Sequence, residues 1–448
     1  MNMPNFSMYE IIDKKKNANE LTKEEIRWVI DGLMSKEVTE YQMTALLMAI
    51  FLNGMTTAET AHLTDAMLYS GTVLKFEGDD VVDKHSTGGI GDKASFILAP
   101  IAASCGVKVP MIAGRGLGFT GGTVDKIESI KGFHTDIPLT EFENLLNDRG
   151  LVLIGQTKDI APADKIIYAL RDVTATIDSI PLITASIMSK KLAEGANGIV
   201  MDIKTGSGAF MSSKSQAKKL AKSILNTASR FDKNSVALIT NMDQPLGNAV
   251  GNTLEIIESI EVLKGNGPKD ITELSLALAA QMIHIGGVEP TYAKALKAAK
   301  KSVKDGSALQ KFRELIKNQN GDEKVIDDYS RLPQAKYTTE VIAPNSAWIK
   351  SFKCDQIGLL ATELGGGRKV KTDKIDFGVG FVFHKKIGDK VKEGESIFTI
   401  HHNEDQTNKV KYITERFFND VVKFSKVKVE KPKTIHEVIE VKKTKRKV

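Results

Sequence analysis

Residues 83–92 combine side chains and glycines that suit phosphate chemistry. They read Asp-Lys-His-Ser-Thr-Gly-Gly-Ile-Gly-Asp, directly after an apolar pair. The glycines let the backbone approach an anion closely, Lys84 offers a positive charge, and Ser86 offers a hydroxyl donor. An imidazole changes charge near neutral pH, so His85 could hydrogen-bond or protonate a leaving group while bound phosphate attacks. These residues predict a phosphate site that contains a histidine. A glycine-rich turn around a structural histidine is the alternative.

A second glycine-rich segment, residues 114–123, reads Gly-Arg-Gly-Leu-Gly-Phe-Thr-Gly-Gly-Thr. Two such loops favour a shared anionic ligand more than either loop does alone. The glycines of the second loop also match the G-x-G-x-x-G pattern of dinucleotide-binding folds. A Rossmann unit would place an acid on the next strand, whereas Asp136 lies in residues 133–138, which we expect to be a strand running into a turn. We therefore favour a phosphate loop over a dinucleotide loop.

Together the two segments resemble the signature motifs of the thymidine and pyrimidine-nucleoside phosphorylase family. The similarity continues in family order along nearly the whole chain, through residues 161–165, 171–176, 190–195 and 204–210. It implies a pentosyl transfer, the reversible phosphorolysis of thymidine or deoxyuridine to the free base and 2-deoxy-α-D-ribose 1-phosphate. Inorganic phosphate is then a co-substrate, and neither a cofactor nor a metal ion is implied. The resemblance also implies a homodimer.

The resemblance assigns roles to residues of both loops and of a later helical segment. Four residues would hold the phosphate oxygens below C1′ for in-line attack: Lys84, Ser86, Ser95 and Thr123. The glycosidic bond breaks with oxocarbenium-like character, so stabilising the departing base matters more than activating a nucleophile that is already anionic. His85, Arg171 and Lys190 would supply that stabilisation.

Residues 162–195 are expected to be helical and to hold the pyrimidine. Tyr168 and Arg171 are three residues apart, so they lie on one side of a helix. Ser186 and Lys190, four residues apart, do the same. Without the resemblance, ordinary helix-surface polarity explains this spacing equally well. With it, Arg171 and Lys190 would donate to a carbonyl oxygen and the ring nitrogen region of the base. Ser186 would bond the base edge, and Tyr168 would pack beside the ring.

Two loop positions differ from the usual family pattern. Ala113 stands where a serine near phosphate is common, and the loss of one hydroxyl contact weakens phosphate binding by about 1 kcal/mol. Phe119 replaces a frequent histidine, with no consequence that we can derive.

A third difference concerns a cation. Lys93 stands where some relatives use a threonine to help bind potassium, with backbone near Leu246 and Ala249 and the carboxylate of Glu258. We expect the Lys93 ammonium to take the place of that cation and to pair with Glu258. Activity should then be independent of potassium.

The preference for one sugar over another depends on Met111. Relatives that accept uridine tend to have a lysine here, whose ammonium can hydrogen-bond the ribose 2′-hydroxyl. Methionine is apolar and suits a 2′-deoxy sugar. We therefore expect thymidine and deoxyuridine to react faster than uridine. A broad pyrimidine-nucleoside phosphorylase that also uses uridine is the alternative.

Two other functions remain open. An anthranilate phosphoribosyltransferase would share the broad architecture, but it uses a Mg²⁺-bound pyrophosphate donor and would lack the pair His85 and Arg171. A non-catalytic nucleoside-binding or signalling protein on the same scaffold is the second. A protein that only binds nucleosides would not need the complete set of charged and polar residues expected at the site, which argues against this second alternative.

The composition is that of a cytoplasmic enzyme. The chain has 448 residues, of which 42% are hydrophobic, enough for a large core. Its two cysteines, Cys105 and Cys354, are too few for a disulfide framework or a tetrahedral zinc site. The N-terminus lacks the apolar core of a signal peptide, and no apolar run is long enough to span a membrane. The net charge of +6 lies partly in the tail 442–447, which has no aromatic residues for base stacking, so we expect no nucleic-acid partner.

The order of the patterns predicts an α/β fold in three parts. The parts are a helical base-binding and dimerisation domain (1–66 and 162–195), a mixed-sheet α/β phosphate-binding domain (67–161 and 196–335) and a C-terminal α+β module (336–440). Three capping boxes predict the early helices: Thr22/Glu25, Thr39/Gln42 and Thr56/Glu59. The apolar stripe of one such helix consists of Met43, Leu46, Leu47, Ile50 and Phe51. Short β-branched runs predict strands at 107–112, 151–154, 198–203 and 235–240.

Residues 337–344 and 387–395 resemble the two halves of a lipoyl-type barrel-sandwich in permuted order. Lys336 stands where a carrier lysine would stand. The acidic residue expected before it is Ala335, and the family uses this module structurally. We therefore expect neither lipoylation nor biotinylation.

Overall fold

The chain begins as a bundle of short helices, and all but the first of them begin at a predicted capping box. A computed structural model describes residues 6–116, 119–370, 372–403 and 407–441. In each box the side chain at the third helical position accepts a hydrogen bond from the backbone N–H of the capping threonine, at 2.6 to 3.1 Å. This prediction is confirmed. The helices are α1 (Met8–Lys16), α2 (Lys23–Ser35), α3 (Glu40–Asn53) and α4 (Thr57–Leu68).

Two later helices complete this bundle. They are α8 (Pro162–Val173) and α9 (Ile180–Ala193). Ala163, Ile167, Leu182 and Ala185 share one apolar core with the predicted stripe of α3, whose Met43, Leu46, Leu47 and Ile50 are buried and whose Phe51 is half-buried. The second half of α9 turns away from this core. Its Met188 and Leu192 pack into the core of the α/β domain, so α9 spans both domains.

The α/β domain contains the four strands that the β-branched runs predicted and two strands, the first and the last among the described residues, that no run predicted. A four-stranded sheet has the order β1 (Val82–Ser86), β4 (Gly198–Thr205), β5 (Asn234–Asn241) and β13 (Ile435–Glu440). A parallel pair, β2 (Val109–Ala113) and β3 (Leu151–Gly155), joins it through a bridge between Val81 and Lys108. Every residue of β4 is buried, because helices cover both faces of the sheet. The alternating residues of β4 divide accordingly between two apolar cores.

Different helices cover the two faces. On one face lie α7 (Leu139–Arg149), α9 and α10 (Lys214–Arg230). The other carries α5 (Ser95–Ser104), α6 (Thr123–Ile127), α11 (Asn252–Leu263), α12 (Lys269–Ile285), α13 (Tyr292–Lys304), α14 (Ser307–Asn318) and the 3₁₀ turns Glu323–Ile326 and Tyr329–Arg331. Among the described residues, no helix combines the length and apolar character needed to cross a bilayer.

One predicted strand is wrong. Residues 133–138 form a loop beside β3. The side chain of Gln319 takes the position of a paired strand, since it accepts from the N–H of Leu153 at 2.9 Å and donates to the carbonyl of Leu153 at 2.7 Å. It also donates to the carbonyl of His134 at 2.7 Å. A side chain from a distant helix therefore satisfies the backbone that a strand would have satisfied.

The C-terminal module consists of two small sheets and two helices. One sheet has the order β6 (Ala249–Val250), β9 (Gly380–Phe383), β11 (Ser396–His402) and β7 (Tyr337–Ile342), and the other β10 (Lys390–Val391), β8 (Ala347–Phe352) and β12 (Val422–Ser425). The helices are α15 (Cys354–Leu364) and α16 (Thr407–Arg416), the latter followed by a π-helical turn (Phe417–Val421). Lys336 lies at the entry to β7, where the chain arrives from the α/β domain.

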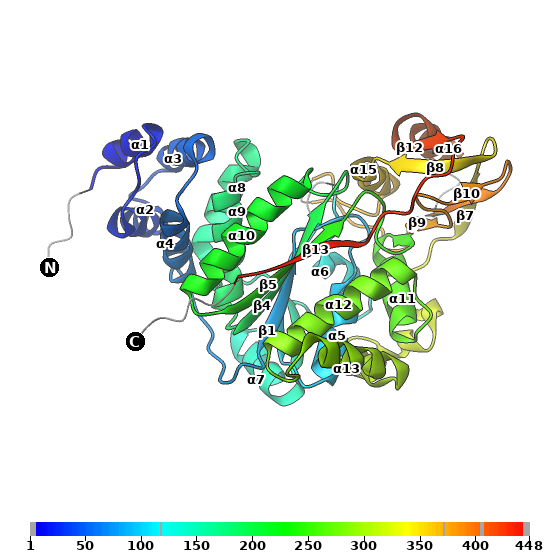
Figure 1. Ribbon diagram of the computed structural model, residues 1–448, viewed down its shortest axis with the longest axis horizontal. Helices are drawn as coiled ribbons and strands as arrows, with labels where there is room; N and C mark the ends of the chain where they lie inside the picture. Colours follow the sequence, from blue (N-terminus) through cyan, green and yellow to red (C-terminus); the bar gives the residue numbers. More distant parts are fainter. Residues whose placement is uncertain (1–5, 117–118, 371, 404–406, 442–448) are drawn as a thin grey trace.

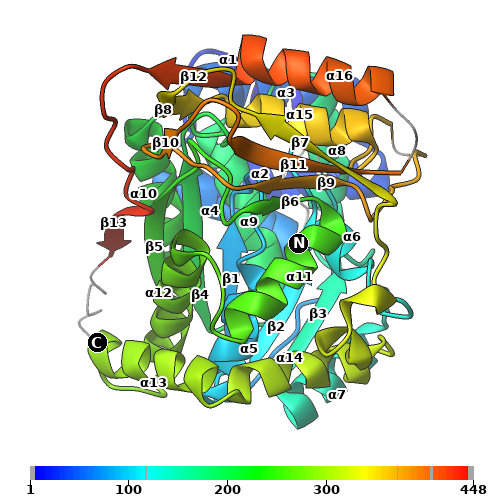
Figure 2. The same cartoon turned by 90° about the vertical axis from the view of Figure 1, so that its right-hand side faces the viewer.

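The predicted boundary of this module requires a correction. Residues 435–440, assigned to the module, form β13 and pair antiparallel with β5 of the α/β sheet. In the opposite sense, β6 belongs by sequence to the α/β domain but pairs with β9 of the module. Figure 2 shows the module above the α/β domain with β13 extending down beside β5. Strand exchange in both directions therefore joins the two parts.

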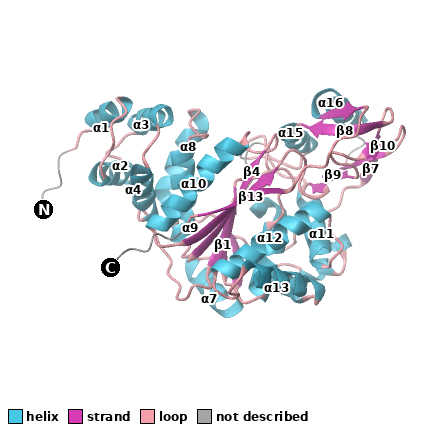
Figure 3. Ribbon diagram, viewed as in Figure 1, coloured by secondary structure: helices cyan, strands magenta, loops and turns pink. Residues whose placement is uncertain are grey.

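The three parts follow one another along the long axis of the molecule. Figure 1 shows α1 to α4 at one end, the α/β domain in the centre and the C-terminal module at the other end. In Figure 3 the strands lie in the centre and in the module, while helices form the opposite end. The bundle helices α8 and α9 lie between α1 to α4 and the sheet, so they are placed to meet ligands of the α/β domain.

Two neighbouring lysines of α1 provide a test of what holds the bundle together. Lys15 pairs with Glu59 at 2.8 Å, with side chains 3% and 0% exposed, whereas Lys14 pairs with Glu25 at 2.8 Å, with side chains 33% and 13% exposed. Both glutamates close capping boxes. Glu59→Ala should lower the free energy of unfolding by about 3 kcal/mol because it leaves a buried ammonium unpaired. Glu25→Ala should cost about 1 kcal/mol.

The measurement is urea unfolding followed by the fluorescence of Trp28, in a Trp348→Phe background that removes the second tryptophan of the chain. Trp28 lies in α2 and its ring contacts Phe6, so it reports on the bundle. Equal losses of unfolding free energy in the two variants would contradict the prediction that the buried ion pair contributes more than the exposed one.

Candidate active site

Two cavities meet at the carboxyl ends of parallel strands, and His85 lines both. The larger, of about 270 Å³, is lined by the ends of β1 and β2, by both glycine loops and by Phe210 after β4. The smaller, of about 150 Å³, is lined by α8, α9, α10 and the end of β1. Ligands of open α/β sheets bind at such strand ends. The two cavities therefore lie where the α/β domain meets the helical domain.

The larger cavity collects the residues that the sequence assigns to phosphate. Lys84, Ser86, Ser95 and Thr123 all line it. Lys84 comes from β1 and lies 3.4 Å from the hydroxyl of Ser95, the first residue of α5. The N-terminal end of α5 adds favourable potential for an anion. Gly88 has a φ of +85°, a conformation that glycine adopts without strain.

Asp92 is part of this cavity, and the sequence did not suggest a role for it. Its carboxylate accepts the hydroxyl proton of Ser86 at 2.5 Å, and Ser86 in turn accepts from the N–H of Gly88 at 3.1 Å. Burial favours the neutral form of Asp92, but the charges of Lys204 and Lys84 hold its pKa well below the usual range. Asp92 therefore stays ionised and orients the Ser86 hydroxyl in the first glycine loop.

The smaller cavity has a mainly apolar lining with a few polar groups. Tyr168, Arg171 and Ser186 line it together with apolar side chains, which include Ile183, Ile187 and Leu220. The guanidinium of Arg171 is buried and donates to the carbonyls of residues 176, 177 and 182 at 2.5 to 3.3 Å. These bonds fix the turn between α8 and α9. A guanidinium has five N–H donors, so two have no hydrogen-bond partner among the described residues.

Lys190 lies behind this lining. Its ammonium donates to the hydroxyl of Ser186 at 2.9 Å and forms an ion pair with Asp164. The side chain of Lys190 is 19% exposed, and that of Asp164 is buried. The structure thus places Ser186 at the cavity and Lys190 one contact further away. Lys190 can polarise the Ser186 hydroxyl from this position.

His85 is held in its neutral form. Burial lowers the pKa of the imidazole well below its usual value, and the positive charges of Lys191, Lys190 and Lys84 lower it further. Asp92 opposes this shift. At neutral pH the ring therefore carries one N–H donor and one acceptor nitrogen. An imidazole in this form can stabilise a developing negative charge by hydrogen bonding.

A buried ion cluster fixes β1 against α9. The ammonium of Lys191 donates to Asp83 at 2.5 Å, to Glu194 at 3.0 Å and to the carbonyl of Ile112 at 3.1 Å. Burial opposes the charge of Lys191, but Asp83 and Glu194 raise its pKa. Asp83 precedes Lys84 and His85, and Lys191 follows Lys190. The cluster therefore sets the separation between the two cavities.

Met111, which we expect to select the sugar, and the two altered loop positions also lie near this cavity. Met111, in β2, is buried and lines the larger cavity, as does Ala113 at the end of the same strand. Phe119 contacts the ring of Phe210, with a centroid distance of 5.6 Å. Phe210 lines both cavities. The pair joins the second glycine loop to the segment that follows β4.

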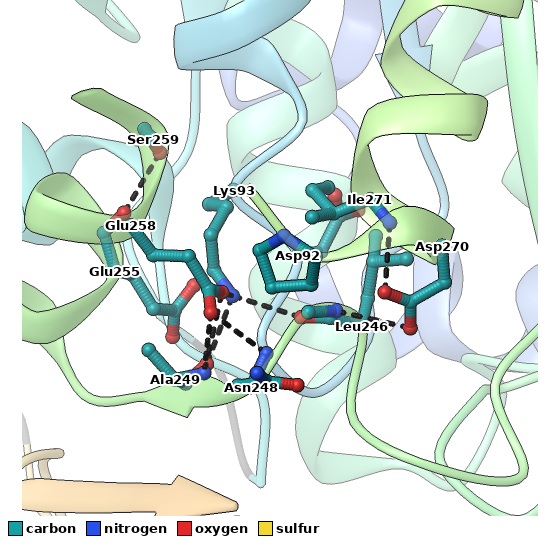
Figure 4. A network of polar contacts seen from close by, with 12 residues as sticks. Asp92, Lys93, Leu246, Asn248, Ala249, Glu255, Glu258, Ser259, Asp270 and Ile271 are labelled. Atoms are coloured by element: carbon teal, nitrogen blue, oxygen red, sulfur yellow. Dashed lines mark hydrogen bonds and ion pairs between the residues drawn. The ribbon is translucent and has the colours of Figure 1, made fainter. Parts of the chain in front are cut away.

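Lys93 is surrounded by oxygen acceptors. Its ammonium donates to the carbonyls of Leu246 and Ala249 at 2.8 and 2.9 Å and to Glu258 at 2.5 Å, as Figure 4 shows. The Lys93 side chain is fully buried. A potassium ion on the same oxygens would overlap the ammonium, so this donor set does not fit a bound cation.

Sequence reasoning missed several residues of the site. Asp164 could have been found by spacing, since it lies four residues before Tyr168 and seven before Arg171 on α8. Ile183 and Ile187 follow the same rule relative to Ser186 and Lys190 on α9. Phe210 lies in a segment that carries the family resemblance, but it was assigned no role, because it reaches the cavity only through the path of the chain after β4.

Known proteins match the chain over nearly its whole length. The model of the glycosyl transferase family a/b domain matches residues 78–309, that of the helical bundle domain residues 9–71, and that of the pyrimidine nucleoside phosphorylase C-terminal domain residues 348–416. A pyrimidine-nucleoside phosphorylase of Geobacillus stearothermophilus is 46% identical over 435 residues, which cover 96% of this chain and 99% of that protein. One of Staphylococcus epidermidis is 45% identical over 436 residues, with the same coverage.

A solved structure shares the fold at low identity. The crystal structure of anthranilate phosphoribosyltransferase from Thermus thermophilus matches with a TM-score of 0.58 and 16% identity, covering 69% of this chain and 99% of that one. This likeness concerns the fold alone. The family models and the identity to the curated relatives decide the membership: the chain belongs to the pyrimidine-nucleoside phosphorylase family.

Proposed function

We propose that the protein catalyses the reversible phosphorolysis of pyrimidine 2′-deoxynucleosides, with thymidine and deoxyuridine as preferred substrates. The observation that carries this proposal is the position of His85 between two cavities of different character. The larger is lined by hydroxyl groups and by Lys84, and the smaller by apolar side chains, Tyr168 and Ser186. A nucleoside whose base fills the smaller cavity would present its sugar to a phosphate in the larger one.

The nucleophile in this mechanism is inorganic phosphate. Lys84, Ser86, Ser95 and Thr123 would hold its oxygens by charge-assisted and hydroxyl hydrogen bonds, so that one oxygen faces C1′. A phosphate–C1′ bond forms as the bond between C1′ and the base nitrogen breaks. The electron pair of the broken bond leaves with the base, which takes up a proton. The products are the free base and 2-deoxy-α-D-ribose 1-phosphate.

Stabilisation of the departing base is the task of the second cavity. Negative charge spreads over the ring nitrogens and carbonyl oxygens of the pyrimidine as the glycosidic bond breaks. The two remaining N–H groups of Arg171 and the hydroxyl of Ser186, polarised by Lys190, would donate to that edge. His85, neutral at pH 7, would donate from the side of the sugar. These groups would favour the transition state over the bound nucleoside, because the charge that they stabilise develops only as the bond breaks.

Met111 supports the preference for a deoxy sugar. Its apolar side chain lines the larger cavity, where a ribose 2′-hydroxyl would find no hydrogen-bond partner from this residue. Use of uridine as well is the alternative, since the curated relatives are named for pyrimidine nucleosides in general. A phosphoribosyltransferase activity like that of the Thermus enzyme is less favoured, because only the fold supports it.

We also propose that the enzyme acts in the cytoplasm as a homodimer. Large apolar side chains on α1 and α3 support a contact between copies through the helical domain, since Tyr9, Tyr41 and Leu52 are more than 70% exposed. Both cysteines are unpaired, as expected in a reducing compartment.

The first prediction concerns the reaction and its sugar preference. The purified protein should release thymine from thymidine faster than uracil from uridine, only with phosphate and without added metal. Met111→Lys should raise kcat/KM for uridine relative to thymidine by about tenfold, since one charge-assisted hydrogen bond contributes about 1.5 kcal/mol or more. Met111→Leu, which conserves volume, should keep the original preference. Chromatographic measurement of both free bases tests this, and equal rates with uridine in the unmodified protein would contradict it.

The second prediction concerns His85. His85→Ala should lower kcat by about 10²-fold or more with little change in either KM, and His85→Gln, which keeps an N–H donor, should retain more activity. Because the pKa of His85 is lowered, its ring should stay neutral as the pH falls below 6.5 and become charged only in more acidic solution. NMR titration of ¹³C-labelled histidine, with the His85→Gln spectrum as assignment, measures this. A midpoint at or above 6.5 in the absence of phosphate would rule out the proposed neutral donor.

The third prediction concerns Lys93, which we propose acts as a built-in substitute for a bound cation. Initial rates should be equal in KCl and NaCl of the same ionic strength. Lys93→Met should destabilise the protein by about 3 kcal/mol because it leaves Glu258 without its cation. Lys108→Met, which removes a partly exposed lysine 3.7 Å from Asp80, serves as the control and should be nearly neutral. Strong activation of the unmodified protein by potassium over sodium would disprove the proposal that Lys93 replaces a bound cation.

A further inference from the structure

The loops of the larger cavity are poor in side chains that could hold them in place. The first loop has glycines at 88, 89 and 91, and the second has glycines at 114, 116, 118, 121 and 122. Glycine loses much conformational freedom on ordering and offers no side chain for packing. A defined phosphate pocket therefore needs support from outside these loops.

Helix α15 of the C-terminal module supplies a surface against both loops. A Cβ at Gly358 would lie 2.0 Å from the carbonyl oxygen of Phe119 and 2.6 Å from the side chain of Ile90. Phe119 belongs to the second loop and Ile90 to the first. The backbone of α15 thus packs directly on both, and only glycine allows this approach at position 358.

Arg368, four residues after α15 ends, reaches the second loop by an ion pair. Its guanidinium donates to Asp125 at 2.9 Å, where the Asp125 side chain is 2% exposed. The other oxygen of Asp125 accepts from the N–H of Gly116 at 2.7 Å. Asp125 also lies in α6, whose first residue is Thr123. One carboxylate therefore links Arg368 to the start of the loop and to the threonine expected to bind phosphate.

The start of α15 contacts a third segment of the site. The hydroxyl of Ser207 accepts from the N–H of Cys354 at 3.2 Å and donates to the carbonyl of Phe352 at 2.9 Å. A Cβ at Gly208 would lie 2.6 Å from the side chain of Cys354. Ser207 and Gly208 precede Phe210, which lines both cavities. All three segments around the phosphate pocket thus rest on one helix and its following loop.

We propose that the C-terminal module positions the phosphate pocket, and that Arg368 is a positioning residue for phosphate binding in the proposed reaction. The inference rests on the proposed function for its kinetic consequence. Arg368 acts through Asp125 on Gly116 and Thr123, and it lines neither of the two cavities. Loss of the Arg368 contact should therefore weaken phosphate binding and leave the nucleoside cavity, which is lined by α8, α9 and α10, unchanged.

The kinetic test uses the full-length protein with phosphate varied at saturating thymidine. Arg368→Gln should raise KM for phosphate about tenfold, since a small displacement of binding groups has effects of this size or larger, while kcat and KM for thymidine stay within about twofold. Arg368→Lys, whose ammonium can still donate to Asp125, should recover part of the loss. Gly358→Ala should change the same constant in the same direction, because its Cβ displaces Phe119.

Two control variants lie next to the tested residues. Lys369→Gln removes a neighbouring charge that pairs with the exposed Glu363, with side chains 58% and 42% exposed. Leu359→Ala shortens an exposed side chain of α15 beside Gly358. Both should leave KM for phosphate unchanged. A phosphate KM of Arg368→Gln within twofold of the unmodified protein would overturn the proposal. A general defect, in which kcat and thermal stability fall and both KM values rise together, would also overturn it.

A second measurement separates this inference from the proposed function. Phosphate should raise the melting temperature of the unmodified protein, and Arg368→Gln should need about tenfold more phosphate for the same shift. This readout does not require turnover. If the unmodified protein releases no base, the proposed reaction fails, and the shift still tests whether Arg368 supports an anion site. Equal shifts in both proteins would disprove the positioning role.

Discussion

The candidate site depends on one buried ammonium. Lys191 of α9 donates to Asp83 of β1 and to the carbonyl of Ile112 in β2. These three elements carry the residues assigned to the base, to phosphate and to the sugar. The charge of Lys191 cannot be left unpaired in the interior, because removal of one partner from a buried ion pair costs about 3 to 5 kcal/mol. The geometry in which β1, β2 and α9 meet is therefore strongly favoured over alternatives that separate them.

Buried lysine–carboxylate pairs also occur around the larger cavity. Lys93, Lys126 and Lys204 are buried, and each pairs with a carboxylate of another residue: Glu258, Glu255 and Asp202. Lys126 also donates to the carbonyl of Asp92 at 2.9 Å. Buried lysines with their own acids fix the loops without placing net charge in the core. Lys84 has another kind of partner, since it reaches the hydroxyl of Ser95, and it lines the cavity. It therefore remains able to attract an anion.

The three parts of the chain act on one site from different directions. The helical domain encloses the smaller cavity through α8 and α9, and the α/β domain provides the strand ends. The C-terminal module rests on the glycine loops through α15, and β13 then returns to pair with β5. Because β6 pairs with β9 in the opposite direction, the module is joined to the α/β domain by backbone hydrogen bonds as well as by side chains. A module attached in this way can hold the glycine loops in place.

Local sequence patterns determine many of the helices and strands of this protein. The capping boxes and the β-branched runs specify helices and strands because they depend on residues close together in sequence. The residue types in the two glycine loops indicated phosphate chemistry for the same reason. The loop at 133–138 escaped prediction because Gln319, distant in sequence, satisfies the backbone of β3. The return of β13 to β5 is equally nonlocal.

At the candidate site, the sequence indicated which side chains could do the chemistry, whereas the tertiary structure determined their charge state and their neighbours. Nothing local could show that His85 is kept neutral by burial and by lysines from α9, that Asp92 orients Ser86, or that Lys190 lies behind Ser186. The local sequence also does not show that Arg368 reaches Asp125. The chemical type of a side chain is a property of a single residue, so the sequence alone gives it. Charge state and position depend on distances between residues far apart in the chain, which exist only once the domains have packed.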